Sequence, residues 1–334
     1  MSRADAGTPA AGENPARTGR TAAARADGAD ARADQAGAAA ATGGGRPGPP
    51  AASGRPPRWW TLGLLSSELA LTLRRGRTLA LLAILAVLPV LIGVAVKIET
   101  GGGDGSGGDG GGPPFINQVT NNGLFLVFTA LAATLPFFLP MTVGVVAGDC
   151  VAGEAASGTL RYLLVAPAGR TRLLLAKFAA VVVFCLLATL VVAVSALLVG
   201  VALFPVGDIT LLSGVTVSFA EGLVRALVIA LAVTVSLLGL AALGLFISTL
   251  TGSGIAAMAA TVGLLITVQI LAVIPQLDVI HPYLFPYHWL SFADLLRAPV
   301  RWDDVLANAG LQALYVAVFG SAAWARFTTR DVTA

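Results

Sequence analysis

The residues best suited to binding or chemistry lie in one polar stretch, Gly148–Lys177, between two long apolar runs. Its charged side chains are two acids and four bases: Asp149, Glu154, Arg161, Arg170, Arg172 and Lys177. The apolar run that follows, Phe178–Gln276, carries only three charges, Asp208, Glu221 and Arg225. Charged side chains are costly inside hydrocarbon. Their concentration in one internal loop therefore predicts a surface that meets water or a partner protein.

Three common motifs of enzymes and nucleotide-binding proteins are missing from the sequence. It contains no Gly-x-x-x-x-Gly-Lys-Ser/Thr loop for phosphates, no His-Glu-x-x-His and no nucleophile elbow. His281 and His288 have no further ligands nearby and are expected at the membrane interface. Cys150 and Cys185 are expected as small apolar residues. We therefore expect no enzyme activity, cofactor or metal on this chain.

The composition predicts an all-α, polytopic membrane protein. Of its 334 residues, 56% are hydrophobic and 12% are charged, and the charged fraction of a soluble protein is about twice as large. About 20 apolar residues cross a bilayer as a helix. Six such runs are predicted as spans: 78–96, 124–146, 178–204, 226–250, 255–274 and 305–325. The segments predicted outside are 97–123, 205–225 and 275–304.

Three features inside the spans predict how they pack. Pro136 and Pro140 predict a bend in the second span. Gln269 is the most polar residue of the fifth span and is expected to face a helix neighbour or the translocation path. The fifth span also offers two small-residue pairs for close helix packing, Ala256 with Ala260 and Ala259 with Gly263.

The segment before the first span has two parts. Residues 1–57 contain no Leu, Ile, Val or aromatic residue and are predicted as a disordered, solvated cytoplasmic tail, without a nucleic-acid partner. Residues 58–77 carry Leu62, Leu65, Leu69 and Leu73 at helical spacing. They predict an amphipathic helix in the membrane interface, or an extension of the first span. Its predicted anchors to the headgroups and to anionic lipid are Trp59, Trp60, Arg74 and Arg75.

The distribution of basic residues predicts the orientation. Of the 21 Lys and Arg residues, 17 fall on segments that share a side with the amino terminus. The four on the other side are Lys97, Arg225, Arg297 and Arg301. Because basic loops stay inside, both termini, with the tail 326–334 and the loop 149–177, are predicted to be cytoplasmic.

Within the polar stretch a short surface helix is predicted over Leu160–Val165. Thr159 can cap it, Leu160 and Leu163 give it an apolar face, and Pro167 stops it. Thr171 can cap the third span. Such a helix suits a cleft in another protein. The alternative is a basic loop that only sets the topology.

The pattern Gly-Glu-x-x-x-Gly-Thr-Leu-x-x-Leu-Leu-x-x-Pro-x-x-Arg, in Gly153–Arg170, is followed by Lys177. It resembles the loop between the second and third spans of type-2 ATP-binding-cassette (ABC) exporter permeases. The resemblance extends to Glu68 with the following Arg74–Arg75, to the outer segment rich in Pro and Tyr, and to the ending Phe327–Val332. It covers roughly residues 60–332.

The resemblance implies a permease subunit in the plasma membrane that works with a separate ATPase subunit. ATP and Mg would bind on that partner, and two permease copies, identical or different, would meet two ATPases. The short helix would be the coupling helix, with ATPase contacts at Glu154, Gly158, Thr159, Leu160, Arg161, Leu163 and Arg170. Arg161 stands where many relatives carry an acid, which changes the polarity of that contact. The other functions considered are a secondary carrier and a membrane anchor or assembly factor without transport.

Overall fold

The computed structural model describes residues 59–101, 114–158 and 169–329. Among these, six helices are long and apolar enough to cross a membrane: α2 (Gly76–Gly101), α5 (Phe138–Ala156), α7 (Arg170–Leu203), α8 (Phe219–Leu250), α9 (Gly254–Leu271) and α10 (Asp303–Thr329). The chain is thus an all-α, polytopic membrane protein, as predicted. The predicted tail 1–57 and the predicted surface helix Leu160–Val165 lie outside the described residues.

The second span is broken into two helices, α4 (Phe125–Thr134) and α5, with a short interruption at residues 135–137. Pro136 lies in the interruption, and Phe137 has φ −131° and ψ −56°, outside the helical region. Pro140 lies in the first turn of α5, where a missing N–H costs nothing. The prediction that prolines bend this span is therefore confirmed.

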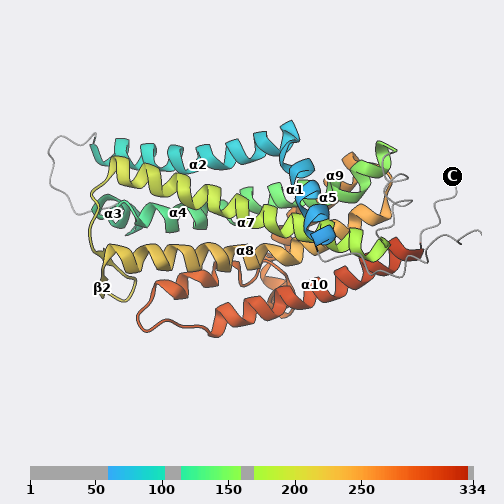
Figure 1. The fold of residues 1–334 in the computed structure, drawn as a ribbon. Coiled ribbons are helices and arrows are strands. Elements are labelled where there is room, and N and C mark those ends of the chain that lie inside the picture. The colour runs from blue at the N-terminus through green and yellow to red at the C-terminus, as the bar shows by residue number, and fades with distance from the viewer. Residues whose placement is uncertain (1–58, 102–113, 159–168, 330–334) are drawn as a thin grey trace, which may run out of the picture. The chain divides into compact units, whose positions relative to one another are not determined.

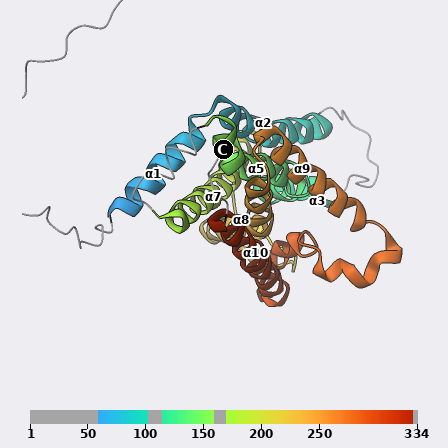
Figure 2. The same cartoon turned by 90° about the vertical axis from the view of Figure 1, so that its right-hand side faces the viewer.

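The helices pack around α8, which contacts α10, α5 and α7. The remaining main contacts pair α5 with α9, and α7 with α1, α2 and α4. Figure 1 shows the long helices running roughly in one direction, with α1 (Trp59–Leu73) lying across them. Figure 2 shows α1 beside α7, whereas α9 lies on another side of the bundle. The core formed between them is apolar, with Phe184, Val192 and Leu237 fully buried.

The bundle has two ends, which Figure 1 separates clearly. The hairpin end holds the antiparallel pair β1 (Ile209–Thr210) and β2 (Thr216–Val217) and the helix α3 (Pro114–Asn121). Gly214 turns this hairpin with φ +79°, a conformation that favours glycine. The loop end holds the carboxyl end of α5, the start of α7 and the end of α10. Three segments were predicted as cytoplasmic: 1–77, 149–177 and 326–334. The parts of them that the structure describes lie together at the loop end.

The predicted outer segments contain more structure than expected. The first holds α3, the second holds the hairpin, and the third holds the 3-10 helices η1 (Pro275–Tyr283) and η2 (Trp289–Leu296). The aromatic side chains of the third segment differ in burial: Tyr283 of η1 is exposed, whereas Trp289 of η2 is buried. η2 therefore packs into the protein, whereas η1 has no buried residue.

Several helices extend beyond the predicted spans because the structure neutralises charges within them. α8 begins at Phe219, where Ser218 accepts a hydrogen bond from the Glu221 amide, and Glu221 pairs with Arg225 one turn later. α7 begins at Arg170 and not at 178, since Lys177 is ion-paired. The residue that precedes α7 is Gly169, so the prediction that Thr171 caps this helix is wrong.

Within this chain, the small-residue pairs predicted for the fifth span make no close helix contact. Ala256, Ala259, Ala260 and Gly263 are exposed in this chain. The face of α9 that is buried carries Gly254, Ala257, Thr261 and Leu265. The close approach is made instead by Gly148 of α5, where an added Cβ would lie 3.0 Å from the Ala257 carbonyl oxygen. Ala-rich helices offer several such stripes, and the partner decides which one is used.

Candidate functional site

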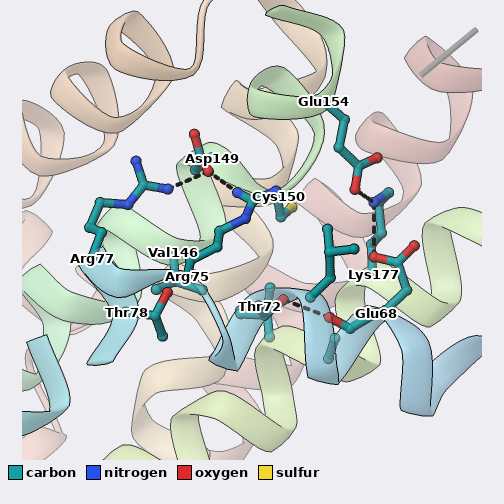
Figure 3. A pocket seen from close by; sticks show the side chains of 13 residues that line it. Glu68, Thr72, Arg75, Arg77, Thr78, Val146, Asp149, Cys150, Glu154 and Lys177 are labelled. Carbon is teal, nitrogen blue, oxygen red and sulfur yellow. Dashed lines mark hydrogen bonds and ion pairs between the residues drawn. The ribbon is translucent and has the colours of Figure 1, made fainter. Parts of the chain in front are cut away.

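A cluster of six charged side chains lies at the loop end, where α1, α2, α5 and α7 meet (Figure 3). Its members are three acids and three bases: Glu68, Asp149, Glu154, Arg75, Arg77 and Lys177. We call this set the charge cluster. The formal charges cancel, which favours the burial of Glu68, Asp149, Glu154 and Lys177, whereas Arg75 and Arg77 stay partly exposed.

Lys177 is the most buried member, with 1% of its side chain exposed. Its Nζ lies 3.0 Å from Glu68 Oε2 on α1 and 2.5 Å from Glu154 Oε1 on α5. Both carboxylates are themselves largely buried. A desolvated ammonium needs such partners, since an unpaired charge in this position is strongly unfavourable. Lys177 therefore fastens three helices from distant parts of the chain to one another.

Asp149 forms the second half of the charge cluster. Arg75 Nη1 and Arg77 Nη2 both donate to its Oδ2 (Figure 3). The two arginines flank the junction of α1 and α2, so a single acid of α5 holds that junction. Arg77 also donates to Met258 Sδ on α9 at 3.2 Å. Guanidinium groups present several donors in a fixed plane and suit a shared carboxylate.

Two glycines make room for the Asp149 carboxylate. A Cβ added at Gly153 would lie 2.6 Å from Asp149 Oδ1, and one at Gly254 would lie 2.5 Å from the same atom. Both distances are far below normal contact, so a side chain at either position would displace the acid. Gly153, the first residue of the loop pattern, is therefore needed to leave space for the Asp149 carboxylate.

The charge cluster surrounds a cavity of about 20 Å³. That volume holds about one water molecule. Thr72 and Thr78 line it together with Cys150, Ala180 and Val181. No group of three or more His, Cys, Asp or Glu side chains in the described part of the chain is arranged to hold a metal ion. The geometry is that of a largely buried ion-pair network that ties α1, α2, α5 and α7 together.

The other end of the polar loop is held by α10. Arg170 Nη1 donates to the Thr328 carbonyl oxygen at 2.9 Å, and Trp324 Nε1 donates to Thr171 Oγ1 at 3.0 Å. On the α5 side, Ser248 Oγ of α8 accepts from the amides of Val151 and Ala152 at 3.0 and 2.9 Å. Both sides of the loop are therefore tied to the bundle by specific bonds.

The residues predicted to contact a partner divide into two groups. Glu154 and Arg170 are described and make the bonds given above. Gly158 has φ +72° and ends α5, a position that suits glycine. The remaining four lie outside the described residues: Thr159, Leu160, Arg161 and Leu163.

The predicted membrane anchors are also placed in part. Trp59 and Trp60 begin α1, and Arg74 is exposed. Arg75 differs from the prediction, because its guanidinium is bound to Asp149 rather than free for lipid headgroups. Asp149 lies near the end of α5, where a negative charge is disfavoured. A nearby pair of arginines was the signal that a sequence reading could have used.

Gln269 lies beside the break in the second span. Its Nε2 donates to the Pro136 carbonyl oxygen at 2.5 Å. That carbonyl is freed by the helix interruption and would otherwise face an apolar environment. Of the two roles expected for Gln269, the structure shows the bond to a helix neighbour.

A buried polar cluster around Asn308 and Gln312 was not predicted from the sequence. Asn308 Nδ2 donates to Ser236 Oγ at 2.7 Å. Gln312 Nε2 donates to the Phe285 carbonyl oxygen at 2.8 Å, and its Oε1 accepts from the Gly239 amide at 3.2 Å. These bonds join α8, α10 and the third outer segment. Two amides spaced i and i+4 in an apolar helix were the available signal.

One family model matches the chain. It is described as a protein of unknown function (DUF2705) and matches residues 109–333, which is 225 of the 334 residues. The match runs from just before α3 to the end of α10 and leaves out Glu68, Arg75 and Arg77 of the charge cluster. The comparison with curated proteins gave no match.

Proposed function

We propose that this chain, which belongs to the DUF2705 family of proteins of unknown function, is the transmembrane permease subunit of an ABC exporter. It would use ATP hydrolysed on a separate ATPase subunit to move a substrate out across the plasma membrane. The coupling would run through the polar loop 149–177. The proposal rests on the resemblance of that loop to type-2 exporter permeases and on the way its ends are held.

One observation carries the proposal. The resemblance picks residues from three separate stretches: Glu68 with the arginines that follow it, the loop with Lys177, and the ending Phe327–Val332. In the fold, Lys177 lies 3.0 Å from Glu68, 109 positions away, and Arg170 bonds the backbone of Thr328, 158 positions away. The three stretches of the pattern thus converge on the α7 end of one loop, and Glu154 joins its α5 end to the same lysine. A loop that only set the topology would have no need for these bonds.

These bonds suit the transmission of a movement. A partner that moves the loop would move α5 and α7 together, because the loop connects these helices and the ion pair of Glu154 with Lys177 joins them. α1 follows through Glu68, and the junction of α1 and α2 follows through Asp149. ATP would supply the shift by binding the closed form of the partner more tightly than the open form. Two permease copies would enclose the path, and uncharged spans suit an apolar or amphipathic substrate.

The orientation can be tested by labelling single cysteines. Val215 is exposed at the hairpin end, and Ala168 lies in the polar loop. Cys150 and Cys185 are first replaced by serine or alanine. In intact cells a membrane-impermeant maleimide should label Val215→Cys and leave Ala168→Cys unlabelled. Labelling of Ala168→Cys in intact cells contradicts the proposed orientation and the cytoplasmic partner with it.

Coupling can be tested by one charge placed in the predicted apolar face of the loop. Leu163→Asp should reduce recovery of the chain with its ATPase, because an unpaired charge would be buried at the contact. Ala168→Asp is the matched control, since it adds the same charge beyond Pro167 and outside that face. Both variants should insert normally. Equal recovery of both variants and the wild type would contradict the coupling role.

A secondary carrier is the second candidate, and one observation favours it. The second span is broken at residues 135–137, and broken helices form ion sites in several secondary transporters. In this chain the Pro136 carbonyl already accepts a bond from Gln269. Transport that continues after ATP depletion but stops when the sodium or proton gradient is collapsed would favour the carrier.

A further inference from the structure

An apolar groove of about 290 Å³ lies between α7 and α8 in the half of the bundle near the hairpin end. Three alanines leave the space: Ala193 on α7, and Ala226 and Ala230 on α8. Larger side chains, Leu190, Leu197 and Leu227, form its walls. The groove is a shaped hollow and not a flat helix face.

The lining of the groove contains no polar or charged residue. Sites for small molecules usually add a few polar groups that orient the ligand. An occupant here is recognised only by its shape and by dispersion contacts. Such recognition suits a hydrocarbon chain.

The position of the groove fits a single leaflet of the bilayer. From Leu190 to Leu197 the α7 wall rises about 10 Å, at 1.5 Å per residue. Half of the hydrocarbon core of a bilayer is about 15 Å thick. The groove also continues into exposed apolar faces of the same helices, at Leu198 on α7 and Leu231 on α8. It is therefore part of the surface that meets lipid.

The charged residue that lies between the lining residues Val224 and Ala226 in the sequence is already engaged. Arg225 follows the wall residue Val224. Its Nη2 lies 2.8 Å from Glu221 Oε1, and its Nη1 donates to the carbonyl oxygens of Leu295 and Arg297 at 2.8 and 3.1 Å. All three guanidinium nitrogens are bonded, so Arg225 has no free nitrogen for a lipid phosphate. Selection by headgroup is not expected.

We propose that this groove holds one acyl chain of a membrane lipid from the leaflet at the hairpin end, independently of the lipid headgroup. The inference rests on the six membrane helices and not on the proposed transport function. Its failure would leave that function untouched. A second copy of the chain on this face is the competing occupant and is a distinct outcome of the test.

The test uses the full chain reconstituted into phosphatidylcholine vesicles that contain a small fraction of phosphatidylcholine with a diazirine on one acyl chain. After illumination, the adducts are mapped by peptide mass spectrometry. We expect adducts concentrated in the peptides that contain 190–197 and 223–230. Replacing the labelled lipid by a phosphatidylglycerol with the same diazirine chain should give the same map.

A filling substitution provides the matched comparison. Ala193→Leu fills the groove, whereas Ala202→Leu makes the same change at an exposed position of α7 outside the groove. Ala193→Leu should reduce the adducts in both peptides to the level found on the exposed face of α2, and Ala202→Leu should leave them unchanged. Equal thermal unfolding midpoints show that both variants fold.

Three results would overturn the proposal. Adducts spread evenly over all exposed faces would mean ordinary surrounding lipid. A map that changes with the headgroup would contradict recognition by chain alone. Efficient disulfide formation between two copies through Val224→Cys, together with an absence of lipid adducts in the groove, would assign the face to a second copy.

Discussion

Replacing Lys177 by Met should destabilise the protein strongly. Met keeps a similar length without the charge, so the main loss is the ion pair that Lys177 makes with each of Glu68 and Glu154. Both carboxylates remain largely buried and lose their cation. Breaking a buried ion pair by removing one partner costs about 3–5 kcal/mol. At about 2–4 °C per kcal/mol, the thermal unfolding midpoint should fall by roughly 6–20 °C.

The assay is thermal unfolding of purified protein in one detergent at one scan rate, because membrane proteins often unfold irreversibly. Arg172→Met is the control, since Arg172 is an exposed base on the same helix and its loss should change little. A triple variant that adds Glu68→Gln and Glu154→Gln to Lys177→Met should recover much of the loss, because no buried charge then lacks a partner. A midpoint for Lys177→Met within about 2 °C of the wild type would refute the reasoning, since the expected loss exceeds 3 kcal/mol.

Three further predictions use the same unfolding assay. Gly200→Ala should cost about 1–3 kcal/mol or prevent folding, because its Cβ would lie 2.0 Å from the Gly123 carbonyl oxygen. Gly263→Ala is the control and should be neutral or stabilising, because nothing lies within 4 Å of the added Cβ. Equal effects of the two substitutions would contradict the close helix approach at Gly200. Gln269→Leu should cost about 1 kcal/mol, because it leaves the carbonyl at the helix break without its donor; an unchanged midpoint would show that this bond contributes nothing. Trp289→Phe should cost less than about 1 kcal/mol, since the indole N–H is buried without a hydrogen-bond partner among the described residues; a larger loss would reveal a partner for that N–H.

Much of the fold could be predicted because hydrocarbon imposes simple rules. Uncharged runs of sufficient length gave all six spans, and the prolines gave the break in the second span. The ends of the spans were the weak point. The sequence reading stopped several spans at a charge, as at Arg225, whereas α8 begins earlier, at Phe219, because Glu221 neutralises that arginine. Pairing between side chains decides where a charged helix can continue.

Most members of the charge cluster lie in stretches that the sequence reading singled out, but their arrangement into one cluster was not predicted. The loop, Glu68 and Arg75 were singled out, yet nothing in the sequence says that Lys177 binds two acids from two other helices. A contact across 109 positions depends on how three helices pack. The same limit explains why the face of α9 that packs within the chain was not predicted and why Asn308 was missed. Each depended on which neighbour faces the residue.

The most direct test of the proposed function is purification of the full chain with a tag from its native membranes, followed by measurement of ATP hydrolysis. A permease subunit should carry an ABC ATPase with it in a fixed ratio. The complex should hydrolyse ATP, vanadate should inhibit the hydrolysis, and the Leu163→Asp chain should recover neither the ATPase nor the activity. A chain that purifies with no ATPase, under conditions where its six-span fold is intact, would contradict the proposed function.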